Sequence, residues 1–97
     1  MIAFADGALD DLDRIFRFNE AFDAPFAQHQ VEIIVAAISV LDQSPYIGRR
    51  VRGSQLRELV IAGGKTGYVA KYEYDEHGDL VRVAAIRHQR EAGYRSR

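Results

Sequence analysis

The hydrophobic period of the chain changes on either side of the Ser44-Pro45 pair, and this change limits the possible folds more than any other feature. Before Pro45, apolar residues recur every three or four positions, which is the spacing of an amphipathic helix. After Gly53, β-branched and aromatic residues gather in short runs bounded by glycine-containing turns, as in strands. This order predicts an α+β fold in which an N-terminal helical hairpin packs on a small, mostly antiparallel β-sheet. We expect residues 1–97 to form a single domain, because about half of them are apolar.

The first half of the sequence predicts two helices. The first spans residues 8 to about 19, with Asp6 as its N-cap and with Asp10 and Asp11 in the first turn, where the helix dipole favours negative charge. The second begins at residues 23–25, since proline is tolerated in a first turn, and runs to about residue 42. Pro45 ends it, because proline moves the residue before it out of the α region. A short link between two helices predicts an antiparallel hairpin.

The second half predicts a three-stranded meander over residues 56–61, 68–74 and 80–87. Residues 2–4 are a candidate further strand, and the basic residues 48–53 form either an irregular lead-in or a short strand at the edge. The last strand is apolar on both faces, which predicts an interior position in the sheet. Tyr68, Tyr72 and Tyr74 share one face of the middle strand, either as sheet packing or as a stacking platform for bases.

Charge is distributed unevenly along the chain. Residues 1–48 contain two Arg against eight Asp and Glu, a balance of −6, whereas residues 49–97 contain eleven Lys and Arg against six acids, a balance of +5. Two solvated faces of one domain would produce this pattern. The alternative is a basic surface that meets an acidic or nucleic-acid partner.

Composition also excludes several classes of function. The chain has no cysteine, which fits a reducing cytoplasm. No segment resembles a signal peptide, and the longest apolar run, residues 31–41, is too short to span a bilayer, so we expect no membrane association. No pair of histidines has the spacing of metal ligands, and we expect neither a metal nor another cofactor.

Three segments carry a resemblance to a known family: Gly53-Ser54-Gln55-Leu56-Arg57-Glu58-Leu59, Gly67-Tyr68-Val69-Ala70-Lys71-Tyr72 and Ile86-Arg87-His88-Gln89-Arg90. Together with the order of helical hairpin, basic loop and meander, they resemble the RelE/ParE superfamily of toxins from type II toxin–antitoxin systems, over nearly the whole chain. The resemblance implies a sheet like a half-barrel, with both helices packed against it. It also implies a small cytoplasmic toxin that inhibits growth, takes part in plasmid stabilisation and is held inactive in a hetero-oligomer by an antitoxin that wraps around it.

The superfamily contains two activities. RelE-like members resemble ribosome-dependent messenger-RNA endonucleases with Lys and Arg on the strands, an Arg after the Gly-Tyr pair, and a Tyr or His near the C-terminus. ParE-like members lack that set and are similar to proteins that poison DNA gyrase. In this chain, Glu58 and Val60 occupy strand positions where RelE-like enzymes carry lysines, and Val69 follows Gly67-Tyr68. The resemblance therefore favours the ParE-like branch, with a target such as DNA gyrase.

The RelE-like alternative, with the ribosome as target, would be an enzyme. A ribonuclease needs a base for the 2′-hydroxyl, cations for the phosphate in its transition state and an acid for the leaving oxygen. The resemblance leaves four residues of the chain for these roles: Arg87, His88, Arg90 and Tyr94. A histidine side chain can act as acid or base, and the alternative for His88 is a histidine at the end of the sheet bonded to backbone.

Six arginines are candidate contacts of an antitoxin or target: Arg49, Arg50, Arg52, Arg57, Arg87 and Arg90. For the first three, the alternative is a solvated basic run with no bound phosphate. Arg57 lies between apolar neighbours in a predicted strand. It either pairs with a nearby acid such as Glu58 or Glu73, which is a structural role, or contacts the partner.

Overall fold

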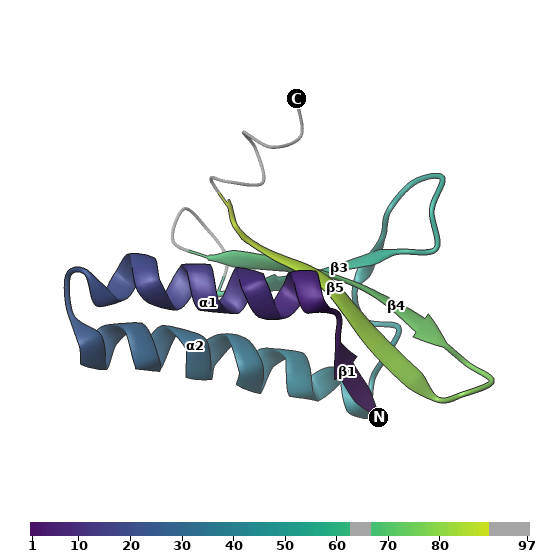
Figure 1. The fold of residues 1–97 in the computed structure, drawn as a ribbon. Helices are drawn as coiled ribbons and strands as arrows, with labels where there is room; N and C mark the ends of the chain where they lie inside the picture. The colour runs from purple at the N-terminus through teal and green to yellow at the C-terminus, as the bar shows by residue number, and fades with distance from the viewer. Residues whose placement is uncertain (63–66, 90–97) are drawn as a thin grey trace.

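The computed structural model describes residues 1–62 and 67–89, and in them two helices cover one face of a five-stranded sheet (Figure 1). The helices are α1 (Asp6–Glu20) and α2 (Ala24–Ser39), and α2 continues into a 3₁₀ turn, η1 (Val40–Asp42). The strands are β1 (Ile2–Phe4), β2 (Arg49–Arg50), β3 (Arg57–Ile61), β4 (Tyr68–Asp75) and β5 (Leu80–His88). The predicted α+β fold, a helical hairpin on a small sheet, is confirmed.

The strands lie in the order β1-β5-β4-β3-β2. Strands β2 to β5 pair antiparallel, and only β1 and β5 run parallel. The strand predicted to be interior, β5, has a neighbour on each side, and the basic lead-in supplies β2 as a two-residue edge strand. The pairing of β1 with β5 extends only from Ile2 opposite Val81 to Phe4 opposite Val83, so the rest of β5 has no strand on that edge.

The predicted N-cap of the second helix is correct, and the predicted N-cap of the first helix is wrong. Asp23 caps α2, and its carboxylate accepts a hydrogen bond from the Phe26 N–H at 3.3 Å. Asp6, however, is already the first residue of α1; its N-cap is Ala5, which makes no side-chain bond. Ala5 lies at the end of β1, where its N–H donates to the Val83 carbonyl, so the sheet fixes the chain one residue before Asp6.

The core lies between the helix layer and the sheet. Both helices, η1 and the strands β3, β4 and β5 contribute buried residues. The largest fully buried side chains are Tyr72, Ile34, Ile38, Leu41, Ile86, Val81 and Val83. The 19 residues Ala24–Asp42 are by length and composition apolar enough to cross a membrane, a test that the core helix of a soluble protein also passes. Their buried side chains face this core.

A register shift in β5 allows both odd-numbered and even-numbered residues of the strand to face the core. Tyr72 lies opposite Val83 whereas its neighbour Lys71 lies opposite Ala85, so Ala84 is an extra residue on β5. One extra residue reverses the alternation of side chains. Val81 and Val83 face the helices before the shift, and Ile86 does so after it.

Tyr72 connects the sheet to the loop that follows α2. Its buried hydroxyl donates to the Pro45 carbonyl and accepts from the Gly48 N–H, each at 2.8 Å. A side chain at position 48 would lie 2.6 Å from the Tyr72 ring, so only glycine fits there. These contacts fix where the chain leaves the helix layer and enters β2.

We expect Tyr72→Phe to lower the free energy of unfolding by about 1–3 kcal/mol, because the Gly48 N–H would be buried without a partner. Equilibrium urea unfolding measures the change. The matched control is Tyr74→Phe, since the Tyr74 hydroxyl bonds to Asp79 in an exposed position and its loss is expected to cost much less than that of the Tyr72 hydroxyl. Equal losses in the two variants would contradict the role given to the buried hydroxyl.

Candidate functional site

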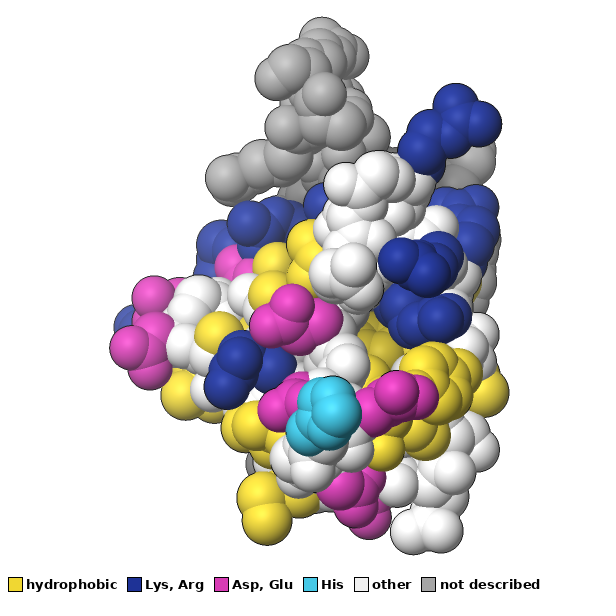
Figure 2. All heavy atoms as spheres, turned by 90° about the vertical axis from the view of Figure 1, so that its right-hand side faces the viewer, with side chains coloured by type: hydrophobic (Ala, Val, Ile, Leu, Met, Phe, Trp, Pro, Cys, Tyr) yellow, Lys and Arg dark blue, Asp and Glu magenta, His cyan; other side chains and the backbone are white. Residues whose placement is uncertain are grey.

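The predicted site residues lie in three separate places within the described part of the chain. Arg49, Arg50 and Arg52 lie on β2 and the turn after it, Arg57 begins β3, and Arg87 and His88 end β5. Arg90 and Tyr94 lie outside the described residues. Figure 2 looks at the end of the molecule that carries the β2–β3 turn, where Lys and Arg side chains gather above a group of acids.

The first place is the basic turn, which we define as residues 49–55. Arg49 pairs with Glu58 across the two strands at 3.1 Å, with most of its own side chain exposed. Arg50 and Arg52 are exposed and make no ion pair within residues 1–62 and 67–89. Gly53 has a φ of +71°, and the Leu56 N–H donates to the Ser54 hydroxyl, so the backbone holds the turn open around a hollow of about 450 Å³.

The second place is Arg57, which pairs with neither of the acids expected for it, Glu58 and Glu73. Its guanidinium donates to the carbonyls of Tyr46 and Gly48, at 3.1 and 2.9 Å, and lies 5.1 Å from the centre of the Tyr46 ring. Glu58 pairs with Arg49 instead, and Glu73 pairs with Arg82. Arg57 therefore holds the loop after η1 against the sheet, a structural role with a different partner from the one predicted.

A cleft of about 370 Å³ opens beside Arg57. Tyr46 and Tyr74 form its aromatic wall, with their rings edge to face at 5.2 Å. The Tyr46 hydroxyl donates to Glu76, and this bond to a carboxylate raises the pKa of Tyr46 to about 12. The Tyr74 hydroxyl donates to Asp79 at 2.9 Å, which likewise raises the pKa of Tyr74. Both hydroxyls stay protonated at physiological pH, so the aromatic wall carries no charge. The cleft lies between the basic turn and the acidic β4–β5 turn.

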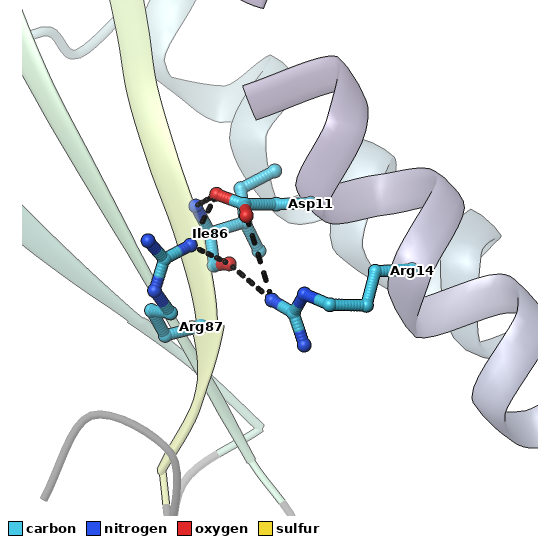
Figure 3. A network of polar contacts seen from close by, with 4 residues as sticks. All are labelled: Asp11, Arg14, Ile86 and Arg87. Atoms are coloured by element: carbon cyan, nitrogen blue, oxygen red, sulfur yellow. Dashed lines mark hydrogen bonds and ion pairs between the residues drawn. The ribbon is translucent and has the colours of Figure 1, made fainter. Parts of the chain in front are cut away.

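The third place is a polar network around Asp11, where α1 meets β5 (Figure 3). The Asp11 carboxylate accepts the buried Ile86 N–H at 2.8 Å and pairs with the Arg87 guanidinium at 2.5 Å. Arg14 lies 3.5 Å from both the same carboxylate and the Ile86 carbonyl. Arg87 is thus held by an acid of the helix layer. Asp11 was expected only to favour the helix dipole, although its spacing from Ala8 and Ile15 places it on the buried face of α1 and was a signal for a buried partner.

His88 points away from Arg87. Consecutive residues of a strand project to opposite faces, and the His88 ring packs edge to face on the buried Tyr68 ring at 5.4 Å. Tyr68 itself bonds to Gln30 of α2 at 3.1 Å, and Tyr72 is fully buried, so both rings serve as sheet packing. Within the described residues, Arg57, Arg87 and His88 do not converge on one point.

Several solved structures have a similar fold. The fold is that of RelE/ParE toxins: a chain of the chromosomal ParDE system from P. aeruginosa superposes with a TM-score of 0.77 at 21% identity, covering 90% of this chain and 92% of that one. The intact RelBE complex of E. coli gives 0.62 at 15% identity (90% and 93%), and the RelBE2 complex of Mycobacterium tuberculosis gives 0.57 at 18% identity (92% and 96%). No curated protein sequence matches the chain.

The family follows from the sequence itself. Residues 2–93 match the family model described as ParE toxin of type II toxin-antitoxin system, parDE. The chain therefore belongs to the ParE toxin family and is the toxin of a type II toxin–antitoxin system.

We expect Asp11→Ala to lower the free energy of unfolding by about 2–3 kcal/mol, because it leaves the buried Ile86 N–H without an acceptor and Arg87 without its carboxylate partner. Asp11→Asn retains an oxygen for the Ile86 N–H and is expected to lose less. The control is Asp13→Ala, whose solvent-exposed pair with Arg17 is expected to contribute little to stability. Chemical unfolding of the three variants decides the point; a loss at Asp13 as large as that at Asp11 would show that the network adds nothing.

Proposed function

We propose that this toxin inhibits growth by binding a protein target such as DNA gyrase, without cleaving RNA, and that it acts in the cytoplasm as part of a plasmid stabilisation system. The observation that carries the proposal is that Arg87 and His88, two candidate catalytic groups, contact other parts of the fold. Arg87 pairs with Asp11, and His88 packs on Tyr68 at the opposite face of the strand. Both groups have structural partners in place of a shared substrate position.

The open face of the sheet supports the same proposal. Glu58 lies there between Arg49 and Lys71, in register with both, at a position where a phosphate-binding lysine would be expected in a RelE-like nuclease. A carboxylate at this point repels a scissile phosphate, and a nuclease needs cations there to stabilise its transition state. Val60, more than half exposed, adds no cation.

We further propose that an antitoxin neutralises the chain by covering the open face and the basic turn. The solved relatives in the comparison are toxin–antitoxin complexes, which supports a partner of this kind. A segment that folds on binding can wrap a large surface, with its apolar anchors supplying most of the affinity. Its acidic side chains would meet the exposed Arg49, Arg50 and Arg52, since two of these three have no acid of their own in the described structure.

The target assignment predicts that His88→Ala and Tyr94→Phe leave growth inhibition largely intact. Loss of a general acid or base typically slows an enzyme about 10²–10⁴-fold, enough to let cells grow, whereas a binding surface tolerates the loss of one peripheral group. Growth after induced expression, with matched protein levels, is measured beside gyrase supercoiling and mapping of cleaved messages on ribosomes. Abolished toxicity in His88→Ala, together with loss of codon-phased cleavage seen in the parent, would establish the RelE-like endonuclease instead.

The antitoxin assignment predicts that Arg50→Glu/Arg52→Glu weakens binding of the antitoxin encoded beside the toxin gene by about 10-fold or more, and makes binding less sensitive to salt. Both side chains are exposed and unpaired in the described structure, so the fold is unaffected. Arg17→Glu on α1, also exposed, is the control for a change in net charge and should bind as the parent does. Calorimetric titration at two salt concentrations measures both effects; unchanged affinity and salt dependence in the double variant would remove the basic turn from the interface.

A further inference from the structure

Three phenylalanines stand exposed where the two helices join. Phe18 near the end of α1, Phe22 in the link and Phe26 at the start of α2 expose 68%, 78% and 47% of their surface. The rings of Phe18 and Phe22 lie edge to face, with their centres 5.7 Å apart. We call these three residues the aromatic tip. The link lies at the end of the molecule away from the β2–β3 and β4–β5 turns (Figure 1).

The fold does not account for the aromatic tip. Phe18 continues the face of α1 that buries Asp11 and Ile15, yet at this end of the hairpin it is left 68% exposed, and Phe22 lies in the link between the helices. Exposing several large aromatic rings together is unfavourable for an isolated domain and is the usual composition of an interface centre. Two edge-to-face rings on a rigid helical hairpin present a preformed anchor, because little side-chain freedom remains to be lost on binding.

Charge around the aromatic tip limits what can cover it. Residues 18–48 contain no Lys or Arg, and Glu20 and Asp23 border the rings. Neither acid makes an ion pair within residues 1–62 and 67–89, and the nearest arginine in the sequence, Arg17, is paired with Asp13 at 2.8 Å. A complementary surface is therefore an apolar pocket with Lys or Arg at its border.

This chemistry separates the possible occupants. A second copy related by a two-fold axis would bring identical acids together. An acidic antitoxin segment complements the basic turn and would be repelled here. An anionic membrane surface attracts basic residues, and residues 18–48 contain none.

We propose that the aromatic tip is the surface with which this toxin binds its target protein, its rings entering an apolar pocket bordered by basic side chains. The inference rests on the proposed function, since it requires a protein target. It assigns target binding to the helix layer and antitoxin binding to the sheet layer.

The test compares Phe18→Ala/Phe22→Ala with the control Leu9→Ala/Val40→Ala, which removes two apolar side chains that are about half exposed, 51% and 49%, away from the tip. Purified DNA gyrase with relaxed plasmid is the probe, and growth after induction is the second readout. We expect the tip variant to need at least about 10-fold more protein for inhibition and to permit growth, since aromatic anchors dominate interfaces. The control should inhibit as the parent does. Thermal unfolding of both variants checks that the fold is retained.

A second variant tests the charge at the border. Glu20→Gln/Asp23→Asn removes both charges, and Asn is as good an N-cap as Asp, so α2 keeps its start. We expect inhibition to weaken several-fold at low salt and to depend less on salt concentration. An unchanged salt dependence would overturn the basic border of the pocket.

The outcomes separate this inference from the proposed function. A parent that inhibits gyrase together with a tip variant that inhibits equally well overturns the tip while the proposed function stands. A parent that arrests growth without inhibiting gyrase removes gyrase as the target; growth of cells with the tip variant then supports the tip, and arrest overturns it. Loss of antitoxin binding in a tip variant that still arrests growth assigns the tip to the antitoxin and overturns the inference. If the parent neither inhibits gyrase nor arrests growth, both proposals are overturned.

Discussion

The contact between the Asp11 carboxylate and the Ile86 N–H joins the helix layer to the edge of β5 where that strand has no neighbouring strand. β1 is three residues long and covers β5 only as far as Val83. Beyond that point the outer edge of β5 meets α1, and a buried backbone N–H there needs an acceptor. Asp11 supplies it at 2.8 Å, in place of a neighbouring strand. Because the carboxylate is almost buried, it also needs a cation, and Arg87 is the one that β5 provides.

The need of Asp11 for a cation also affects which arginines can serve a function. Arg87, a candidate catalytic cation, balances an almost buried acid, which supports the proposal that the chain acts by binding. Arg57 shows the same logic at the other end of the sheet, where two backbone carbonyls and the Tyr46 ring occupy its guanidinium. The arginines left with neither an acid nor such backbone contacts in the described structure are Arg50 and Arg52, on a turn that places them at the edge of the sheet.

The sequence predicts the elements well because their signals are local. Helical spacing, the Asp23 cap and the alternation of Tyr68 and Tyr72 each depend on residues a few positions apart, and the structure confirms them. Contacts across the fold could not be predicted in this way. Asp11 and Ile86 are 75 residues apart, and the Arg57 partners lie on a loop whose path depends on Tyr72. The Asp6 cap failed for the same reason, because β1 fixes the preceding Ala5. The extra residue at Ala84 has no local signature in a run that is apolar on both faces.

The uneven charge of the sequence becomes an arrangement in space. The acidic half forms the helix layer and ends in an aromatic tip without a nearby unpaired cation, while the basic half forms the sheet and carries the unpaired arginines. Surfaces of opposite character at opposite ends of one small domain favour different partners, since like charges facing each other across an interface are costly. A toxin must meet both a target and an antitoxin, and a domain of this size has few surfaces to offer. Separating the two by charge allows each surface to exclude the wrong partner without any change in the fold between them.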